Sequence, residues 1–388
     1  MKHFTVQLFL FIISGLINNT FSQQIPVLQL SSAIEKPVPI TTSDFLESLT
    51  YIPLATSPDY MVDANPKIYV TKDHILIITL EKCQLFDRRN GEFIREIGRK
   101  GRGPGEYYTT SGFFNESTRS YYFVGSKGYL IKYTLDGIFC GSMKIPEYND
   151  GFEIISFPDI YSYLNDTILV CNFVTGNGTE NKILMTFTEK GNVIKIFPNN
   201  NILEKKNNLV ISIGDSKFHR FDNSLFYSNR YNDTVFRITK NQMVPSFIVN
   251  AGKYRPPFES RWWPAEKMQK SDYVFQLNII ENTRFIAFNF FLISNKDLYF
   301  TLYDKQSKSL KVTKNQSGIE NTTDGFVNVK MSSINDAGEL SFLVQPGEIL
   351  EWIKQNPEKF NALKPEIQKL KDLKLEDNPV VVIAKYKK

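Results

Sequence analysis

The sequence predicts an all-β fold, because short β-strand patterns recur along most of its length. Runs of β-branched and aromatic residues, separated by turn residues, extend from Leu49 to about Val344. Many share one form: an apolar strand, a polar turn that often contains glycine, and a second strand. These hairpins begin at intervals of roughly 45 to 65 residues. A repeat of this length made of strands alone favours a β-propeller over a β-sandwich.

Five segments carry the hairpin pattern most clearly. They are 84–94 (QLFDRRNGEFI), 129–140 (YLIKYTLDGIFC), 183–197 (ILMTFTEKGNVIKIF), 234–247 (TVFRITKNQMVPSF) and 298–312 (LYFTLYDKQSKSLKV). In the first three the turn contains Gly91, Gly137 or Gly191, and glycine accepts a positive φ at little cost.

Further strands accompany these hairpins and bring the number of units to six. The segments are 67–80, 120–126, 166–173, 224–230, 284–293 and 325–331. Each unit has about 61 residues, which is long for a four-stranded blade, so we expect long loops or insertions.

Two segments interrupt the strand pattern and predict helices. Residues 256–274 combine proline, tryptophan and a polar helical stretch, and indicate an excursion between blades. Residues 346–378 show a helical period broken by Pro357 and Pro365, so we expect two or three short helices there.

The chain then ends in a strand pattern over residues 379–387. We expect this strand to pair in one blade with residues 47–55, which would close the ring and remove a sheet edge. The prediction is therefore one six-bladed domain over residues 23–388.

The N-terminus predicts export. Lys2 precedes an apolar run from Phe4 to Ile17, and Thr20 and Ser22 are small residues at the positions that a signal peptidase reads. We expect residues 1–22 to be a signal peptide and the mature protein to be soluble, in the periplasm or outside the cell. A buried N-terminal segment is the alternative. The residues directly after the apolar run contain no cysteine to which a lipid could be attached, so a lipoprotein anchor is not expected.

Charge and cysteine content exclude several classes of protein. The net charge of +5 over 388 residues is small and interspersed, so nucleic-acid binding is not expected. Cys83, Cys140 and Cys171 are odd in number and widely spaced, which is typical of buried free thiols rather than of disulfides or a zinc site.

Several of these segments resemble a known family. Residues 51–57 (YIPLATS), 83–98 and 98–107 (GRKGRGPGEY) are similar to the exported six-bladed β-propeller proteins of Bacteroidetes, which in turn resemble NHL-repeat propellers. Further matches lie at 120–137, 232–238, 273–288 and 377–387. The resemblance implies a six-bladed propeller, export and an association with glycan-rich environments, and it implies no shared catalytic residues.

The glycine-rich segment 98–107 is interpreted as a structural turn. It lacks the G-x-x-x-x-G-K-[ST] order of a phosphate-binding loop, and Pro104 blocks the helix that such a loop needs. We expect its glycines to let the chain pass from the outer strand of one blade to the next blade near the axis. The turn residues are Gly98, Gly101, Gly103, Pro104, Gly105 and Tyr107.

Motifs for catalysis and metal binding are missing from the sequence. His74 and His219 are far apart, and neither a zinc motif nor G-x-S-x-G occurs. We therefore expect no metal and no cofactor, and assign no catalytic residue. Carboxylates from different blades could still meet at the axis, so a catalytic site stays open.

The candidate ligand-binding residues are aromatic and basic. Trp262 and Trp263, with Arg255, Arg261 and Tyr254, form the cluster most typical of a sugar site, although they could instead pack the excursion onto the propeller. Arg230, together with Asn229 and Asn232, forms a second polar group, and His219 is a third candidate.

From these observations we predict an exported, monomeric, non-catalytic propeller that binds a glycan or peptide. The alternatives are a lyase or hydrolase with its active site in the central funnel, and a scaffold in a cell-surface complex. Inward-facing His, Asp, Glu or Arg side chains around the axis would favour the enzyme, and an exposed aromatic platform would favour binding.

Overall fold

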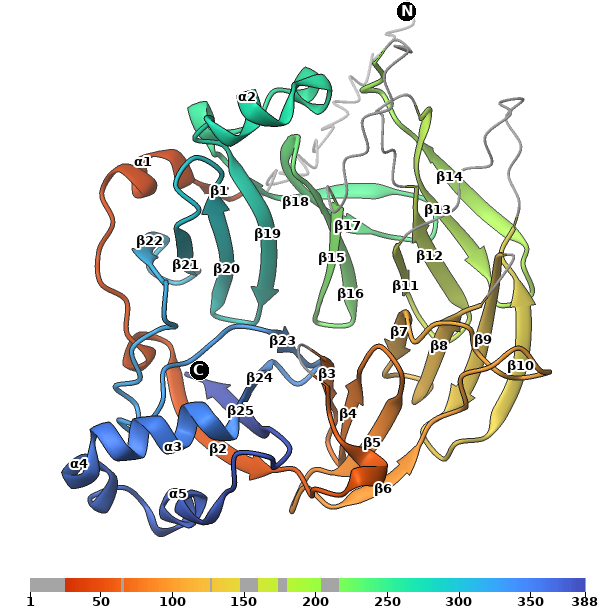
Figure 1. Cartoon of the computed structure of the whole chain (residues 1–388). Helices are drawn as coiled ribbons and strands as arrows, with labels where there is room; N and C mark the ends of the chain where they lie inside the picture. Colours follow the sequence, from red (N-terminus) through yellow and green to blue (C-terminus); the bar gives the residue numbers. More distant parts are fainter. Residues whose placement is uncertain are drawn as a thin grey trace, which may run out of the picture.

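The strands of the protein form six sheets arranged as blades around a central axis (Figure 1). The structure is a computed structural model and describes residues 25–63, 66–125, 128–146, 160–173, 180–203 and 216–387. It confirms the prediction of an all-β, six-bladed propeller. The predicted signal peptide at residues 1–22 lies outside the described residues.

Each blade contains a four-stranded antiparallel sheet. Blade 1 consists of β3 (Lys67–Val70), β4 (His74–Ile78), β5 (Cys83–Asp87) and β6 (Phe93–Glu96); blade 2 of β7 (Gly112–Asn115), β8 (Ser120–Val124), β9 (Tyr129–Thr134) and β10 (Phe139–Lys144). Blade 3 consists of β11 (Ile160–Tyr163), β12 (Ile168–Asn172), β13 (Lys182–Thr188) and β14 (Val193–Pro198); blade 4 of β15 (Ser216–Phe221), β16 (Ser224–Asn229), β17 (Asn232–Ile238) and β18 (Met243–Val249). Blade 5 consists of β19 (Val274–Glu281), β20 (Phe285–Leu292), β21 (Leu298–Asp304) and β22 (Ser309–Lys314); blade 6 of β23 (Ser333–Ile334), β24 (Glu339–Val344), β25 (Val380–Tyr386) and β2 (Leu46–Pro53).

A strand from the N-terminal part of the chain and the last strand meet in blade 6, as predicted. Strand β2 pairs antiparallel with β25, from Leu46 opposite Tyr386 to Pro53 opposite Val380. Because β25 lies between β2 and β24, its residues from Val380 to Ala384 are buried. Figure 1 shows this pairing as the orange β2 beside the blue β25.

The hydrophobic core is divided among the six interfaces between neighbouring blades. For example, Leu76 and Leu85 of blade 1 pack with Tyr121 and Phe123 of blade 2, and Ile68 and Phe86 of blade 1 pack with Val381 and Ile383 of blade 6. Equivalent clusters join blades 2 and 3, 3 and 4, 4 and 5, and 5 and 6. The ring is therefore held by apolar packing between all neighbouring blades.

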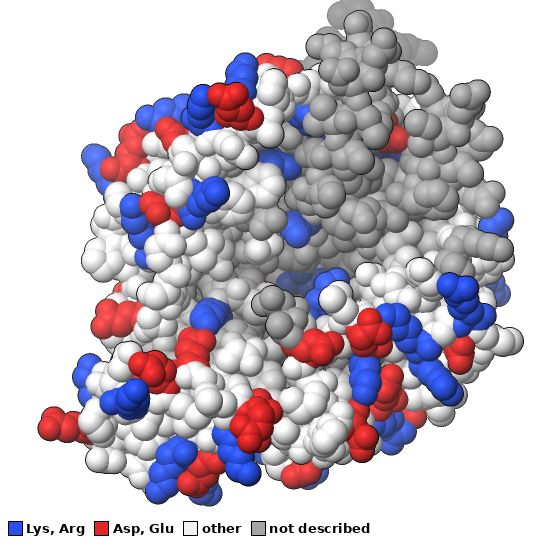
Figure 2. Space-filling view, viewed as in Figure 1, with Lys and Arg blue, Asp and Glu red and all other residues white. Residues whose placement is uncertain are grey.

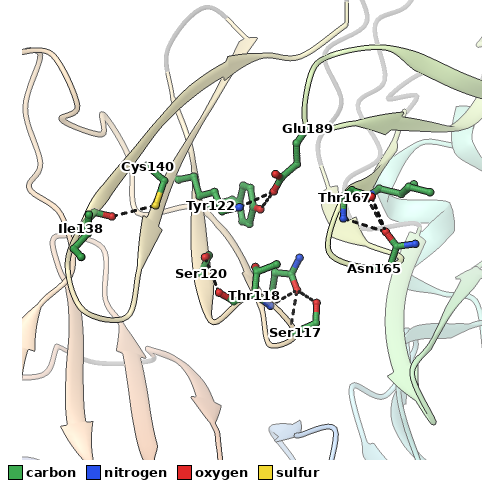
Figure 3. A network of polar contacts seen from close by, with 12 residues as sticks. Ser117, Thr118, Ser120, Tyr122, Ile138, Cys140, Asn165, Thr167 and Glu189 are labelled. Carbon is green, nitrogen blue, oxygen red and sulfur yellow. Dashed lines mark hydrogen bonds and ion pairs between the residues drawn. The ribbon is translucent and has the colours of Figure 1, made fainter.

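Polar contacts supplement this packing between blades 2 and 3. Figure 3 shows Tyr122 of β8 and Glu189, which follows β13, pointing toward one another. The hydroxyl of Tyr122 donates to Glu189 Oε1, and Nζ of Lys132 donates to the same oxygen over 2.8 Å.

Both segments that were predicted to be helical, 256–274 and 346–378, contain helices. A 3₁₀ helix, Gly252–Tyr254, precedes the predicted excursion, which contains a second 3₁₀ helix, Phe258–Trp262, followed by α2 (Ala265–Gln269). The C-terminal insertion contains α3 (Pro346–Gln355), α4 (Pro357–Asn361), α5 (Pro365–Gln368) and a 3₁₀ helix, Lys369–Asp372. Each of α3, α4 and α5 begins at a proline, whose missing N–H costs nothing in the first turn.

Short elements before blade 1 were not predicted. Strand β1 (Val27–Leu28) adds to blade 4 parallel to β18, and α1 (Leu30–Glu35) follows it. Two 3₁₀ helices, Thr42–Asp44 and Pro58–Tyr60, flank β2. Among the described residues no helix has the length and apolar character needed to cross a membrane.

The predicted strand at 325–331 is wrong. Val329 makes only a single bridge with Ile319, and Gly325 has a φ of +78°, which breaks an extended run. The apolar residues of the segment instead pack against the C-terminal helices, where Phe326 meets Trp352 edge-on at 4.8 Å. Strand β23 takes the innermost place in blade 6.

The expectation of buried thiols is correct for two of the three cysteines. Cys83 and Cys171 are buried, whereas Cys140 is exposed. Cys140 lies on β10, the outermost strand of blade 2, and none of the described strands pairs with its outer edge.

The glycine-rich segment joins β6 of blade 1 to β7 of blade 2. Gly98 and Gly105 have φ values of +67° and +80°, whereas the φ values of Gly101 and Gly103 are not positive. Tyr107 is fully buried, and its ring stacks on Phe123 at 4.0 Å. The turn thus places an aromatic anchor in the core between the first two blades.

We predict that Gly105→Val lowers the melting temperature by roughly 1 to 3 °C, because a β-branched residue at positive φ costs about 1 to 2 kcal/mol. Lys100→Ala is the control within the same turn: it removes only an exposed ion pair with Glu81, of 2.6 Å, and should shift the melting temperature by less than about 1 °C. Differential scanning calorimetry measures both variants. The reverse ranking would show that the basic side chain, rather than the backbone of the turn, supports the fold.

Candidate functional site

The axis of the propeller contains a cavity of about 510 Å³, which we call the axial channel. The six innermost strands, β3, β7, β11, β15, β19 and β23, each contribute to its wall. Its aromatic lining residues are Tyr69, Phe113, Phe114, Tyr161, Tyr163 and Phe218. Its charged lining residues are Lys67, Glu116, Lys217, Arg220 and Asp336, and His219 lies among them. A cavity that combines aromatic walls with a few convergent polar groups is the default ligand site in a fold of this kind.

The turns between the first and second strands of the blades form one rim of this channel, because all innermost strands run in the same direction. Asparagine side chains fix several of these turns. Asn115 Oδ1 accepts the N–H of Ser117 over 3.2 Å, Asn165 Oδ1 accepts that of Thr167 over 3.0 Å, and Asn335 Oδ1 accepts that of Glu339 over 2.8 Å. The contacts of Asn165 with Thr167 are visible in Figure 3. Such side-chain turns hold the following residue in place, which is Glu116 in blade 2 and Asp336 in blade 6.

Glu116, Tyr163, Arg220 and Asp336 come from four blades and form one group, which we call the rim cluster. The N–H of Asp336 donates to Glu116 Oε2 over 3.3 Å, and Arg220 Nε lies 3.6 Å from Asp336 Oδ1. The Arg220 guanidinium lies 3.8 Å from the centroid of the Tyr163 ring and donates to the Tyr163 carbonyl over 2.7 Å. The N–H of Glu116 donates to the Tyr163 hydroxyl over 3.2 Å.

The carboxyl group of Glu116 is a weaker acid than an ordinary glutamate. Burial, together with the negative charge of Asp336, raises the pKa of Glu116 to about 7, although Arg220 acts in the opposite direction. Glu116 therefore exchanges its proton near neutral pH, and it can serve as a hydrogen-bond donor or acceptor for a ligand.

A second polar group in the wall of the channel ties blade 4 to blade 5. His219 Nε2 lies 3.1 Å from Glu281 Oε2, and Lys305 Nζ donates to Glu281 Oε1 over 2.7 Å. Burial alone would raise the pKa of Glu281, but its hydrogen bonds with His219 and Lys305 lower it. His219 and Glu281 are both buried, and the imidazole stacks on Phe226 of its own blade at 4.9 Å, so the pair lies buried between blades 4 and 5. Its contacts suit a structural tie.

The structure does not bring the predicted ligand residues together in one site. His219 is in the channel wall, whereas Trp262 and Trp263 lie half-buried in the excursion. The Trp263 ring faces Lys267, whose Nζ lies 3.4 Å from its centroid, so this ring is not an open platform.

The three predicted arginines have different surroundings. Arg255 is paired with Asp233 and donates to the carbonyls of Arg230 and Val249 over 2.7 and 2.8 Å, so it holds the excursion to blade 4. The guanidinium of Arg230 lies 4.1 Å from the ring centroid of Phe275. Arg261 lines a separate cavity between blades 3 and 4.

Sequence reasoning missed the rim cluster. Glu116 and Asp336 each follow an asparagine at the end of an innermost strand, in FFNES and SINDA. That dipeptide pattern was the available signal, but its meaning depends on knowing which strand of each blade faces the axis.

The described residues provide no recognisable metal centre, since they contain no group of three or more His, Cys, Asp or Glu side chains with suitable placement. On the face that Figure 2 shows, basic and acidic side chains alternate over the described surface. Neither observation indicates which class of ligand the axial channel binds.

Comparison with known proteins supports the fold. Residues 25–385 match the family described as a domain of unknown function, DUF4934. The structure is similar to that of a candidate exported protein of Bacteroides fragilis, with 16% identity, a TM-score of 0.69 and coverage of 94% of this chain and 100% of the other. It is also similar to a member of the DUF4221 family from Bacteroides vulgatus, with 10% identity, a TM-score of 0.51 and coverage of 88% and 97%. No curated protein matches the sequence.

We predict that Glu116→Gln raises the stability of the protein relative to the wild type more at about pH 8 than at about pH 5. Because the folded state raises this pKa from 4.5 to about 7, the stability that Glu116 contributes is complete below about pH 4.5 and is lost as the pH rises through about 7. The neutral amide avoids that loss. The difference in melting temperature between variant and wild type should therefore be about 2 °C more positive at pH 8 than at pH 5.

Glu92→Gln, at an exposed turn position, is the matched control and should give the same small difference at both pH values. An equal effect of Glu116→Gln at the two pH values would contradict the raised pKa.

Proposed function

The chain belongs to the DUF4934 family, and on that premise we propose that it is an exported propeller that binds a polar ligand in its axial channel without catalysing a reaction. The proposal depends above all on one observation: a cavity of about 510 Å³ with aromatic walls, to which all six blades contribute and which has a charged rim. The ligand classes that suit it are glycans and peptides.

Export is supported by two observations. The N-terminal sequence has the pattern of a signal peptide over residues 1–22, and a structurally similar protein of Bacteroides fragilis is described as a candidate exported protein. A periplasmic or extracellular location, a monomeric state and the NHL-like character of the repeats stay predictions.

The chemistry of the channel suits recognition. Aromatic faces such as that of Tyr69 can stack on sugar rings or on apolar side chains. Arg220 can donate to a hydroxyl or carboxylate, and Glu116 can change its hydrogen-bonding role with its protonation state. The cation Arg220 is also paired with Asp336, so the rim does not need a ligand to neutralise it.

A hydrolase or lyase is the second candidate, and the rim cluster favours it specifically. Glu116 and Asp336 are two neighbouring carboxyl groups, and the pKa of Glu116 is raised to about 7. A protonated acid beside an ionised carboxylate is the division of roles that glycoside hydrolysis uses. The third expectation, a scaffold in a cell-surface complex, stays a prediction.

A screen of the mature protein on glycan and peptide arrays tests binding. We expect at least one ligand to bind, and Arg220→Met to weaken its binding about tenfold, or about 1.4 kcal/mol. Arg89→Met removes an equally long cation from an exposed turn and should leave binding unchanged.

Two outcomes would contradict the proposal. If no ligand binds on either array, or if the wild type and Arg220→Met bind equally well, the axial channel is not the ligand site. Release of products from a bound glycan, abolished by both Glu116→Gln and Asp336→Asn, would replace binding by the second candidate.

A further inference from the structure

A second cavity, of about 360 Å³, lies beside the rim cluster, and we call it the rim groove. Blades 4, 5 and 6 contribute to its wall. It shares Arg220, Asn335 and Asp336 with the axial channel, so the two cavities adjoin at the rim cluster. Each volume alone suits a small ligand, so a ligand that fills both cavities has to be elongated.

The rim groove is bordered by turns and strand ends that the structure describes. The turns that follow the first strand of each blade, which include 222–223, 282–284 and 335–338, all lie within the described residues. The rest of the wall comes from residues 385–387, at the end of β25, and from Glu47 of β2. Because β2 and β25 close the ring, the groove exists only in the closed propeller.

Two local features of the backbone place acidic side chains at the groove. The pairing of β2 with β25 shifts register between Leu46 and Ser48, so Glu47 is the extra residue of a β-bulge. A bulge re-aims one side chain and is common beside functional sites. Asp222 lies in the two-residue turn between β15 and β16, and its φ of +48° is one that aspartate tolerates.

Four exposed side chains bring hydrogen-bonding atoms to the groove, namely Glu47, Asp222, Thr283 and Lys385. Within the described part of the chain, none of these four side chains forms a hydrogen bond or an ion pair. A carboxylate only accepts hydrogen bonds, an ammonium group only donates them, and a hydroxyl does both. Sugar hydroxyls also donate and accept, so this set of groups matches a polyhydroxylated ring.

A peptide finds little to bind in the rim groove. In the turn after β23, the N–H of Gly338 already donates to the Asn335 carbonyl over 2.9 Å. The two larger apolar residues of the wall offer no pocket: the Phe221 ring is covered by Lys305, whose Nζ lies 4.2 Å from its centroid, and Tyr386 is only 8% exposed. Peptides are recognised chiefly through main-chain pairing and apolar pockets, so the groove suits a sugar better.

The charges at the groove are balanced. The carboxylates of its wall belong to Glu47, Asp222, Glu281, Asp336 and Glu339, and its cations are Arg220, Lys385 and Lys387. Glu281 is also paired with Lys305 over 2.7 Å. Glu339 is paired with Arg88 over 2.8 Å. With these two partners the cations equal the carboxylates in number, so no excess of one sign selects a charged ligand.

We propose that the ligand of the axial channel is a neutral oligosaccharide, one end of which lies in the channel while the next sugar lies in the rim groove; this rests on the binding function proposed above. In the channel, aromatic rings such as that of Tyr69 contact the face of one sugar. In the groove, Glu47 and Asp222 accept hydrogen bonds from the hydroxyls of the next sugar, and Lys385 donates to them.

Isothermal titration calorimetry of the mature protein with neutral sugars of increasing length tests the assignment. The probes are malto-, cello-, manno- and chito-oligosaccharides of one to three residues, and a tripeptide of alanine with blocked ends. We expect the trisaccharide of at least one series to bind at least about tenfold more tightly than its monosaccharide, because only the longer sugar reaches the groove.

Three outcomes would overturn the proposal. Equal affinities for mono- and trisaccharides in every series would exclude the groove, no binding of any of these sugars would exclude the oligosaccharide, and tighter binding of the tripeptide than of every sugar would replace the sugar by a peptide. The function proposed for the channel fails on different results, namely two arrays without a ligand or an Arg220→Met variant that binds as well as the wild type.

Variants locate the longer sugar. Glu47→Ala combined with Lys385→Met, both at exposed positions where loss of folding is not expected, should bring the affinity for the trisaccharide to within about twofold of that for the monosaccharide. Glu92→Ala combined with Lys240→Met changes a matched exposed pair outside both cavities and should keep the full gain. If the first double variant keeps the gain, or if the control loses it as well, the longer sugar binds elsewhere and the proposal is wrong.

Discussion

The pairing of β2 with β25 is the interaction on which the rest of the structure depends. Blade 6 combines β2 with strands from the C-terminal part of the chain, and only a complete blade 6 can pack on blade 5 and on blade 1 at the same time. An open ring would expose the edge of β25 and the apolar faces of two blades to water. The axial channel also requires closure, because its lining combines Lys67 and Tyr69 of blade 1 with Ile334 and Asp336 of blade 6. Ring closure is thus a condition for the candidate site as well as for stability.

Closure explains why charged side chains can lie at the axis. The ends of the innermost strands and the turns after them bring polar residues from several blades to one rim, where they pair across blades. The rim cluster and the His219–Glu281–Lys305 group are both of this kind. Since a buried charge is tolerated only when it is paired, these contacts fix the relative positions of the blades. Burial and the negative charge of Asp336 also raise the pKa of Glu116 to about 7, which is a property that a ligand site can use.

Much of the fold could be predicted from the sequence, because hairpins and turns are encoded locally. Segments such as 84–94 carry their own alternation and turn glycine, and the closing strand was recognisable as an isolated β-pattern after a helical segment. Residues 325–331 misled the prediction because an apolar loop that covers the core has the same composition as a strand. The candidate site was less predictable. Glu116 and Asp336 are 220 residues apart, and only the ring geometry brings them together. Arg261 was predicted as a ligand residue, but its pocket partners on β13 were not, for the same reason.

Hydrogen–deuterium exchange of the unliganded protein tests the central claim, ring closure, most directly. If β2 and β25 hold the ring together, their amides should exchange as slowly as those of the central strands of blades 2 and 4, because all of them open only when the whole ring unfolds. Exchange of β2 and β25 that is faster by a factor of about 100, while the other blades stay protected, would show that blade 6 opens independently and would contradict the account.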